Sequence, residues 1–276
     1  MKKFWIFALA ILICVPVLRA ADEGKIPPDE KDAKERLNKT PRHGEFVDIT
    51  VPGAKVPLKS FIVFPESKEK APVVIVISEI YGLSDWIRSV ADQLAADGFI
   101  AIAPDLISGM GPNGGGTDSI ANRDDVVKAI RSLKNEQVAA DLMAVRDYAI
   151  NLPAASGKFA SIGFCWGGGA SFIYATREPR LSAAVVYYGT SPSNPGDYEG
   201  IKAPVQGHYG GNDARVNMTI PTAKENMSKL NKTYDPHVYE GAGHGFLRAQ
   251  SQNEANAKAA GEAWPATIMF LKQHTK

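Results

Sequence analysis

Two continuous apolar runs constrain the fold of this chain more than any other feature. Residues 72–77 read PVVIVI and residues 99–103 read FIAIA, without the polar alternation of a strand that has one face in water. Such runs are typical of strands that are buried on both faces of a parallel sheet. Between them, from Ser84 to Gly98, apolar residues recur every three or four positions, which predicts a helix with a serine N-cap and a glycine stop. The order strand, helix, strand predicts a right-handed βαβ crossover.

The same alternation extends over most of the chain. Residues 45–51 and 56–64, separated by Pro52-Gly53, predict an antiparallel hairpin before the first buried strand. The other segments that we expect are strands at 159–163, 181–188, 204–209 and 237–239, helices at 126–151, 167–176, 221–230 and 253–272, and a glycine-rich loop at 107–122. Residues 45–276 are therefore predicted to form a single α/β domain, with a mostly parallel central sheet, an N-terminal antiparallel hairpin and helices on both faces.

The first twenty residues have the three parts of a secretory signal peptide. A basic head, Met1-Lys2-Lys3, precedes a fifteen-residue apolar stretch and the small residue Ala20. The apolar stretch is shorter than the ~20 residues that a membrane span needs. The alternative to a signal peptide is an N-terminal anchor that is not cleaved. We expect residues 1–20 to be removed, no stable membrane span to remain, and the protein to be secreted or periplasmic. Residues 21–44 are rich in Lys, Asp and Pro without an apolar period, which predicts a flexible lead-in.

Charge and cysteine content exclude several classes of protein. The 31 basic and 30 acidic residues give a formal net charge of +1, and removal of residues 1–20, with three basic residues and no acid, would leave −2. That balance excludes a protein that neutralises a nucleic-acid backbone, so no nucleic-acid partner is expected. The two cysteines are Cys14 and Cys165, so the mature chain would keep one thiol and could form no internal disulfide. We expect a monomer that acts on a small molecule.

The remaining cysteine lies in the strongest local motif of the chain. Gly163-Phe164-Cys165-Trp166-Gly167 stands between a predicted strand and a predicted helix. G-x-nucleophile-x-G is the pattern of a nucleophile elbow, a strained turn in which side chains at either glycine would collide across the turn. The turn would hold Cys165 above the carboxyl edge of the sheet, at a helix N-terminus whose dipole favours a thiolate. The alternative is a small buried residue in a tightly packed glycine turn.

A cysteine nucleophile requires a base, and the base requires an acid that orients it. His244, in a glycine-flanked loop after a late strand, is the candidate base. Asp213, directly after strand 204–209, is the candidate acid, unless it is only a turn residue. Nucleophile, acid and base then follow one another as Cys165, Asp213 and His244, which is the order found in α/β-hydrolases. The other histidines lie in the lead-in, within strands or at the tail: His43, His208, His237 and His274.

The loop SEIYG at residues 78–82 closes the first buried strand. In α/β-hydrolases this loop and the residue after the nucleophile supply the two backbone N–H groups of the oxyanion hole, which would be those of Ile80 and Trp166. Glu79 could hold the thiol protonated at rest or take its proton when substrate displaces it, or it could be a solvated loop acid. Tyr81, in the same loop, is a candidate substrate contact.

Together these residues resemble the dienelactone hydrolase family. The resemblance rests on the G-x-C-x-G-G elbow, the E-x-x-G loop, the later Asp and the segment H-G-F-x-R at 244–248, and it covers residues 45–273. It implies a single-domain α/β-hydrolase fold without a metal or organic cofactor. The roles that it implies are Cys165 as nucleophile, His244 as base, Asp213 as its orienter, and Glu79 as the switch that keeps the resting thiol from oxidising.

The resemblance also implies that Arg248 contacts the carboxylate of an acidic substrate. The family's second carboxylate-binding arginine should follow Pro104-Asp105-Leu106, but this chain has no arginine after that point until Arg123. An export signal is unusual for a cytoplasmic enzyme of aromatic degradation. Both departures concern the identity of the substrate rather than the hydrolytic chemistry.

The function expected from the sequence is hydrolysis of an ester or lactone through a thioester on Cys165. One alternative is a broad-specificity carboxylesterase that acts on small exported or cell-surface esters with the same residues. An alternative from another class is a non-catalytic binding protein that uses the same cleft as a ligand pocket.

Overall fold

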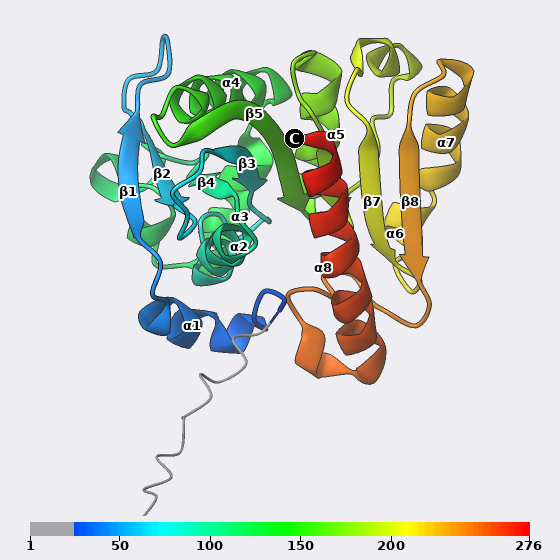
Figure 1. The fold of residues 1–276 in the computed structure, drawn as a ribbon, viewed down its shortest axis with the longest axis horizontal. Helices are drawn as coiled ribbons and strands as arrows, with labels where there is room; N and C mark the ends of the chain where they lie inside the picture. The colour runs from blue at the N-terminus through cyan, green and yellow to red at the C-terminus, as the bar shows by residue number, and fades with distance from the viewer. Residues whose placement is uncertain (1–24) are drawn as a thin grey trace, which may run out of the picture.

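One eight-stranded sheet runs through the protein, in the order β1-β2-β4-β3-β5-β6-β7-β8 (Figure 1). The structure is a computed structural model that describes residues 25–276. β2 pairs antiparallel with β1 and with β4, and every other pair of neighbouring strands is parallel. The strands are β1 Gly44–Ile49, β2 Leu58–Val63, β3 Ala71–Ile77, β4 Ile100–Pro104, β5 Ala155–Phe164, β6 Ala184–Tyr187, β7 Val205–Gly210 and β8 Tyr234–Tyr239. The mostly parallel sheet and the antiparallel hairpin are therefore confirmed.

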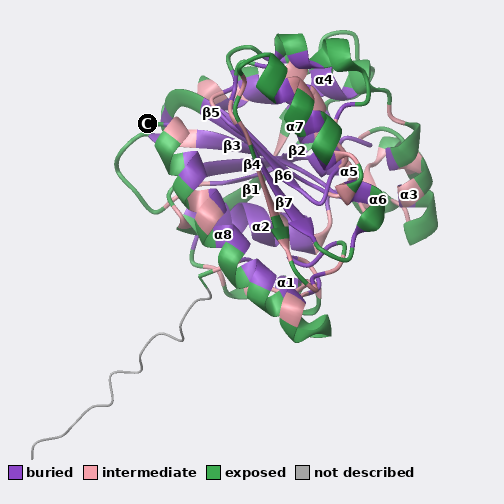
Figure 2. Cartoon of the chain, turned by 90° about the vertical axis from the view of Figure 1, so that its right-hand side faces the viewer, coloured by how far each residue is buried: buried purple, intermediate pink, exposed green. Residues whose placement is uncertain are grey.

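Helices cover both faces of the sheet, as the sequence predicts. The helices are α1 Ala33–Lys39, α2 Asp85–Ala96, α3 Arg123–Ser132, α4 Asn135–Ile150, α5 Trp166–Arg177, α6 Ala214–Asn217, α7 Ile220–Lys229 and α8 Glu254–His274. α2 and α8 share one apolar cluster with the side chains of Val74 and Val76, whereas α4, α5 and α7 share the other with Val73, Ile75 and Ile77. Alternate residues of β3 thus point into opposite layers, and both layers are dry, which explains its unbroken apolar run (Figure 2).

The parallel register aligns the carboxyl ends of four strands at one edge. Ile77 of β3 pairs with Gly163 of β5, and Tyr187 of β6 pairs with both Phe164 of β5 and His208 of β7. The residues that follow these strands therefore emerge next to one another. In open α/β sheets this edge is where ligands bind.

The helix predicted at 126–151 is two helices instead. α3 and α4 are separated by Leu133 and Lys134, both of which have extended backbone. The physical reason is that the two halves pack on different partners. The apolar residues of α3 contact Ile107 in a small separate cluster, whereas those of α4 contact the main core.

The flexible lead-in predicted for 21–44 is wrong for the part that the structure describes. Residues 30–32 form a 3₁₀ turn, α1 follows, and α1 packs against α2. The segment is polar because it lies on the surface, but its capping aspartate and its ion pairs give it a defined conformation. One of these is the buried pair between Arg42 and Asp92 at 2.8 Å.

The signal peptide predicted for residues 1–20, and its cleavage after Ala20, lie outside the described residues. Between residues 25 and 276, none of the helices combines the length and apolar composition that a bilayer crossing requires.

Candidate active site

Cys165 is the single residue of the turn between β5 and α5. Its φ of 53° and ψ of −115° form a backbone conformation that costs on the order of 1–3 kcal/mol for a residue with a side chain. A Cβ at Gly163 would lie 1.9 Å from the carbonyl oxygen of Gly167, and one at Gly167 would lie 2.3 Å from that of Ser78. Both positions therefore require glycine, because a side chain at either one would collide with backbone, as the motif predicts. The contact of Gly167 with Ser78 shows that the elbow packs against the end of β3.

The structure brings Cys165, His244 and Asp213 together in one chain of contacts. His244 Nε2 lies 3.1 Å from Cys165 Sγ, and His244 Nδ1 lies 2.5 Å from Asp213 Oδ2. Asp213 is 7% exposed, and its other oxygen accepts from the Val216 N–H at 3.4 Å, which fixes the carboxylate at the start of α6. With Nδ1 donating to that carboxylate, Nε2 is the lone pair that faces the thiol. The His244 side chain is 36% exposed, so water reaches the ring.

The resting form of Cys165 is the thiol. Burial, followed by the negative charge of Glu79, raises its pKa to about 11. The Trp166 N–H and the guanidinium groups of Arg215 and Arg248 act in the opposite direction without outweighing burial. The helix N-terminus therefore does not by itself produce the thiolate that the sequence favours. Formation of the thiolate requires a proton acceptor, and His244 is the group within reach.

Glu79 is a buried carboxyl group between the elbow and Arg248. It is 4% exposed, and burial raises its pKa to about 7 even though Arg248 Nε lies 2.8 Å from its Oε2. The thiol faces His244, whereas the Glu79 carboxylate faces Arg248 and the side chain of Tyr188. The two groups act on each other through their charges, because an ionised Glu79 raises the pKa of the Cys165 thiol. The alternative of a solvated loop acid is excluded by its burial.

The two expected substrate contacts, Arg248 and Tyr81, stay predictions, and the structure shows which groups their side chains touch. Arg248 is ion-paired with Glu79 and Glu30, so its guanidinium is already occupied by two carboxylates. The Tyr81 ring is covered by the guanidinium of Arg123, 3.5 Å from the ring centroid. Neither Arg248 nor Tyr81 lines the cavity at Cys165.

The predicted oxyanion residues do line that cavity. Ile80 and Trp166 flank Cys165, and the Trp166 N–H interacts with the cysteine sulfur. The glycine-rich loop 107–122 supports the Ile80 side. Its Thr117 Oγ1 accepts from the Leu83 N–H at 3.1 Å and donates to the carboxylate of Asp105 at 2.8 Å. This loop therefore contacts the end of the turn at residues 79–82, which contains Ile80.

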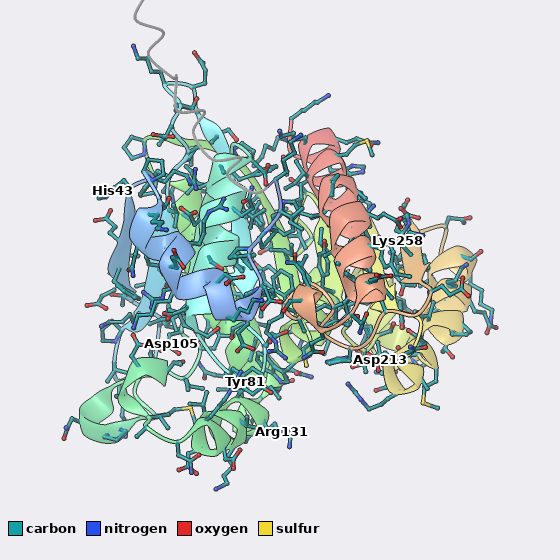
Figure 3. All side chains as sticks on the ribbon, turned by 90° about the horizontal axis from the view of Figure 1, so that it is seen from below. His43, Tyr81, Asp105, Arg131, Asp213 and Lys258 are labelled. Carbon is teal, nitrogen blue, oxygen red and sulfur yellow. The ribbon has the colours of Figure 1, made fainter. Side chains whose placement is uncertain are left out.

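The cavity at Cys165 has a volume of about 390 Å³. Its walls combine apolar surface from α5, two arginines and the side chains of Cys165 and His244. The lining residues are Ile80, Arg131, Asn135, Cys165, Trp166, Gly169, Ala170, Ile173, Tyr188, Thr190, Arg215 and His244. Figure 3 looks onto the carboxyl ends of the parallel strands, where Tyr81, Arg131 and Asp213 are labelled on the same side of the molecule.

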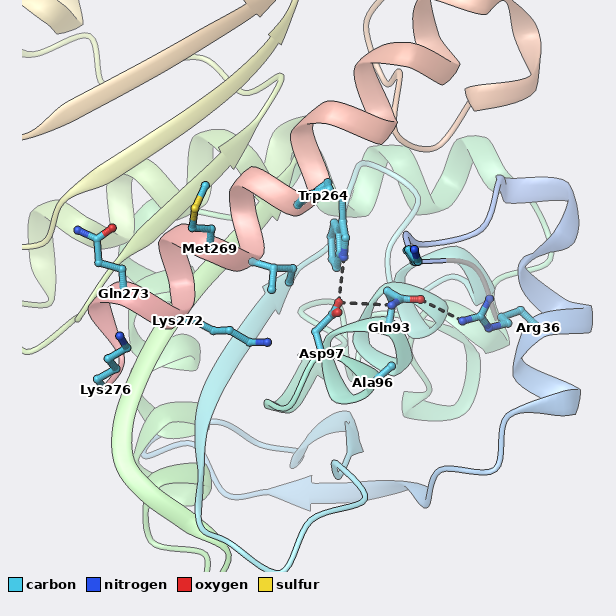
Figure 4. Close-up of a pocket in the computed structure, with 12 residues that line it drawn as sticks. Arg36, Gln93, Ala96, Asp97, Trp264, Met269, Lys272, Gln273 and Lys276 are labelled. Carbon is cyan, nitrogen blue, oxygen red and sulfur yellow. Dashed lines mark hydrogen bonds between the residues drawn. The ribbon is translucent and has the colours of Figure 1, made fainter. Parts of the chain in front are cut away.

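A larger hollow of about 970 Å³ lies elsewhere, between α2 and α8 (Figure 4). Three hydrogen bonds connect four of its lining residues: Arg36 donates to Gln93, Gln93 to Asp97, and Trp264 to Asp97. Neither a thiol nor a histidine lines it. The chemistry of the chain is therefore concentrated in the smaller cavity.

Five residues around the site are not predicted by any sequence pattern described above. Tyr188 directly follows β6, so its place at the carboxyl edge could have been read from the topology. The others approach from α3, α6 and the N-terminal segment, and they carry no motif that would have singled them out: Arg123, Arg131, Arg215 and Glu30. Among the described residues, no group of three or more His, Cys, Asp or Glu side chains could hold a metal ion.

Comparison with known proteins assigns the chain to a family. The sequence pattern of the dienelactone hydrolase family matches residues 58–275. The chain belongs to the dienelactone hydrolase family. A protein of Yersinia pestis that is provisionally named carboxymethylenebutenolidase is 30% identical over 253 residues, covering 87% of this chain and 93% of its own. One of Escherichia coli K12 with the same provisional name is 32% identical over 221 residues, covering 76% of this chain and 79% of its own.

Solved structures agree with this assignment. A provisionally named dienelactone hydrolase from Klebsiella pneumoniae is 28% identical with a TM-score of 0.73, covering 85% of this chain and 100% of that one. A dienelactone hydrolase-like promiscuous phosphotriesterase from metagenomic libraries, at 22% identity and a TM-score of 0.71, shares the fold, with coverage of 85% and 99%. The predicted α/β-hydrolase fold is confirmed, and the protein is a dienelactone hydrolase-like hydrolase.

Proposed function

We propose that this protein hydrolyses a small carboxylic ester or lactone, with Cys165 as nucleophile, His244 as base and Asp213 as the acid that orients His244. The observation that carries the proposal is the pair of contacts on the His244 ring, to the elbow sulfur at 3.1 Å and to a buried carboxylate at 2.5 Å. Membership of the dienelactone hydrolase family supports the class of reaction.

Acylation begins with transfer of the thiol proton from Cys165 to His244 Nε2. The thiolate attacks the carbonyl carbon, and the negative charge passes to the carbonyl oxygen, which the N–H groups of Ile80 and Trp166 receive. Collapse of this intermediate breaks the carbon–oxygen bond of the ester. His244 returns the proton to the leaving alkoxide, and the acyl group remains on Cys165 as a thioester.

Deacylation uses the same groups with water as the nucleophile. His244, whose side chain is 36% exposed, accepts a proton from a water molecule that attacks the thioester. The tetrahedral intermediate again places its negative charge at the two backbone N–H groups. Its collapse releases the carboxylic acid, and His244 gives the proton back to the sulfur.

The role of Glu79 is to keep the Cys165 thiol protonated before substrate binds. Ionised Glu79 raises the pKa of the Cys165 thiol, which keeps the sulfur protonated and less open to oxidation. Protonated Glu79 no longer repels the thiolate. Because burial raises the pKa of Glu79 to about 7, both states are populated near neutral pH.

The cavity of about 390 Å³ suits a small ester or lactone. Trp166 and Ile173 provide an apolar wall, while Arg131 and Arg215 are the cations on the wall. An acidic lactone that enters this cavity would meet these two arginines. The alternative, a carboxylesterase of broad specificity, would use the apolar wall alone, and kcat/KM for a dienelactone against neutral short-chain esters distinguishes the two.

The test of the proposal is substitution of His244 beside a matched control. His237 also pairs with an aspartate, Asp235 at 2.8 Å, but lies on β8 outside the cavity. His244→Gln should lower kcat/KM on an aryl acetate by about 10³-fold or more, because the thiol loses its proton acceptor. His237→Gln should retain wild-type activity. Equal activity of the two variants would refute the proposed mechanism.

The non-catalytic alternative predicts a different course. A binding protein with this cleft would acquire one label at Cys165 from an ester analogue and release no product. Repeated turnover, measured as many product molecules per protein, excludes it, whereas one equivalent of product followed by arrest supports it.

We also propose that the protein is exported and processed at Ala20. The support is the basic, apolar and small-residue pattern of residues 1–20. N-terminal sequencing of protein recovered outside the cytoplasmic membrane should begin at Ala21. Recovery of the chain with an intact N-terminus in the membrane fraction would contradict this.

A further inference from the structure

The N-terminal segment around Pro27 to Glu30 is fixed against the turn that follows His244 (Figure 1). Main-chain and side-chain groups from distant parts of the sequence hold it. The hydrogen bonds are Trp86 Nε1 to the Pro28 carbonyl (3.0 Å), Gln250 Nε2 to the Pro27 carbonyl (2.9 Å), Ser251 N to Asp29 Oδ2 (2.8 Å) and Glu30 N to the Arg248 carbonyl (2.9 Å). These contacts give Glu30 a defined position beside Arg248.

The carboxylate of Glu30 bridges two arginines. One oxygen pairs with Arg248 Nη1, and the other lies 2.7 Å from Arg123 Nη2. On its other side, Arg248 Nε lies 2.8 Å from Glu79. Four charges therefore alternate through successive ion pairs, here called the charge line: Arg123, Glu30, Arg248 and Glu79. The charge of Glu79 acts in turn on the Cys165 thiol.

This arrangement shares the charge of Arg248 between two carboxylates. Glu79 is almost fully buried and has Arg248 as its ion-pair partner. Without the Glu30 carboxylate, Arg248 would be ion-paired with Glu79 alone. The negative charge of Glu30, which disfavours ionisation of Glu79, would also be lost. A charge-neutral residue at position 30 would therefore leave Glu79 ionised at lower pH.

We propose that Glu30 is a positioning residue of the active site, which the N-terminal segment delivers to Arg248 so that the guanidinium is shared between Glu30 and the buried Glu79. The inference rests on the proposed function of Cys165 as nucleophile. Glu30 touches neither the thiol nor the cavity, so it acts through Arg248 and Glu79. The segment outside the compact sheet thereby sets the protonation state of the group that controls the thiol.

The charged and titratable groups that act on Glu79 come from five parts of the fold. Arg248 and Arg123 favour its ionised form, and Glu30 favours its protonated form. Tyr188, after β6, lies beside the carboxylate, and Cys165 interacts with it through charge. Glu30 and Arg123 therefore act on Glu79 with opposite sign, although they are ion-paired with each other. That opposition gives two variants with opposite expected effects.

The rate of Cys165 alkylation by iodoacetamide, measured against pH, reports on Glu79 without any ester. In the wild type the logarithm of the rate should rise less steeply around the pH where Glu79 ionises, because the new charge holds back the thiolate. Glu30→Gln should move this inflection to lower pH by about half a unit to one unit, and Arg123→Gln should move it to higher pH. Glu35→Gln, in α1 and outside the charge line, is the matched control and should leave the profile unchanged.

A double-mutant cycle separates this role from a structural one. In a Glu79→Gln background the inflection should be absent, and adding Glu30→Gln should then leave the alkylation profile unchanged. Circular dichroism and thermal unfolding establish that each variant is folded. If Glu30→Gln does not fold, the test is made with Arg123→Gln: the inflection in its alkylation profile should move to higher pH, and this effect should be absent in the Glu79→Gln background.

A rate ratio between Glu30→Gln and wild type that is the same at every pH would overturn the inference. So would an equal effect of Glu30→Gln with and without Glu79. Because alkylation needs no substrate, a shifted profile in a protein that hydrolyses no ester would uphold this inference and refute the proposed function. Ester hydrolysis with an unshifted profile would do the reverse.

Discussion

Replacing Gly167 by alanine tests whether the elbow depends on contact between two backbones. The added Cβ would lie 2.3 Å from the carbonyl oxygen of Ser78 and 2.4 Å from that of Ile77, far inside van der Waals contact. Both atoms belong to the end of β3 rather than to a flexible side chain, so β3 or α5 must move. Overpacking of this kind costs about 1–3 kcal/mol, and the higher helix propensity of alanine returns at most about 1 kcal/mol. We expect a net loss of stability of about 1–2 kcal/mol.

Gly167→Ala should also have a large loss of activity in the fraction of protein that remains folded. Ser78 leads directly into Glu79 and Ile80, so a displaced strand end moves a proposed oxyanion donor relative to Cys165. We expect kcat/KM on an aryl acetate to fall by about 10²-fold, since removal of one such donor costs 10²–10³-fold. Gly261→Ala is the control: nothing lies within 4 Å of its added Cβ, and it should be about 0.5–1 kcal/mol more stable in guanidinium unfolding. A Gly167→Ala variant as stable and active as wild type would refute this reasoning.

Three further substitutions test the site. Asp213→Asn should lower kcat by about 10³–10⁴-fold with a small change in KM, because the amide favours the wrong tautomer of the histidine; steady-state kinetics with less than a tenfold loss would contradict this. Glu79 has a pKa of about 7 in the folded state against an ordinary 4.5, so its ionisation destabilises the fold. As pH rises from about 4.5 to about 7, the free energy of unfolding of the wild type in urea should fall by on the order of 3 kcal/mol relative to that of Glu79→Gln. If the difference in unfolding free energy between the two proteins does not change with pH, burial does not carry this cost. Arg131→Gln combined with Arg215→Gln should raise KM about fivefold or more for 4-nitrophenyl hemisuccinate and leave it within about twofold for 4-nitrophenyl acetate; equal effects on both esters would exclude an anion contact at this wall.

The sheet and the elbow could be predicted from the sequence because both depend on local chemistry. An unbroken run such as residues 72–77 has few alternatives to a strand buried on both faces, and the structure places residues 73–77 alternately in two buried apolar layers. Gly163 and Gly167 are required by contacts within a few residues of Cys165 or at the end of the adjacent strand. Sequence order then places Asp213 and His244 after parallel strands at the same edge.

The residues that surround the elbow depend on contacts between distant parts of the chain. Glu30 reaches Arg248 across 218 positions, because hydrogen bonds hold residues 27–30 against the turn after His244. The lead-in was predicted to be flexible because its polarity was taken for absence of structure, whereas its acids are partners of arginines. The motif that contains Arg248 is local, but its ion-pair partners Glu30 and Glu79 lie far away in the sequence and could not be predicted from it.

The direct test of the central claim is to find the acyl group on the protein during turnover. Rapid mixing with 4-nitrophenyl acetate, acid quench and peptide mass spectrometry should reveal one acetyl group on the peptide that contains Cys165. The label should be absent from Cys165→Ala, which should also have lost hydrolysis. An acetyl group on a different residue, or full turnover by Cys165→Ala, would contradict cysteine as the nucleophile.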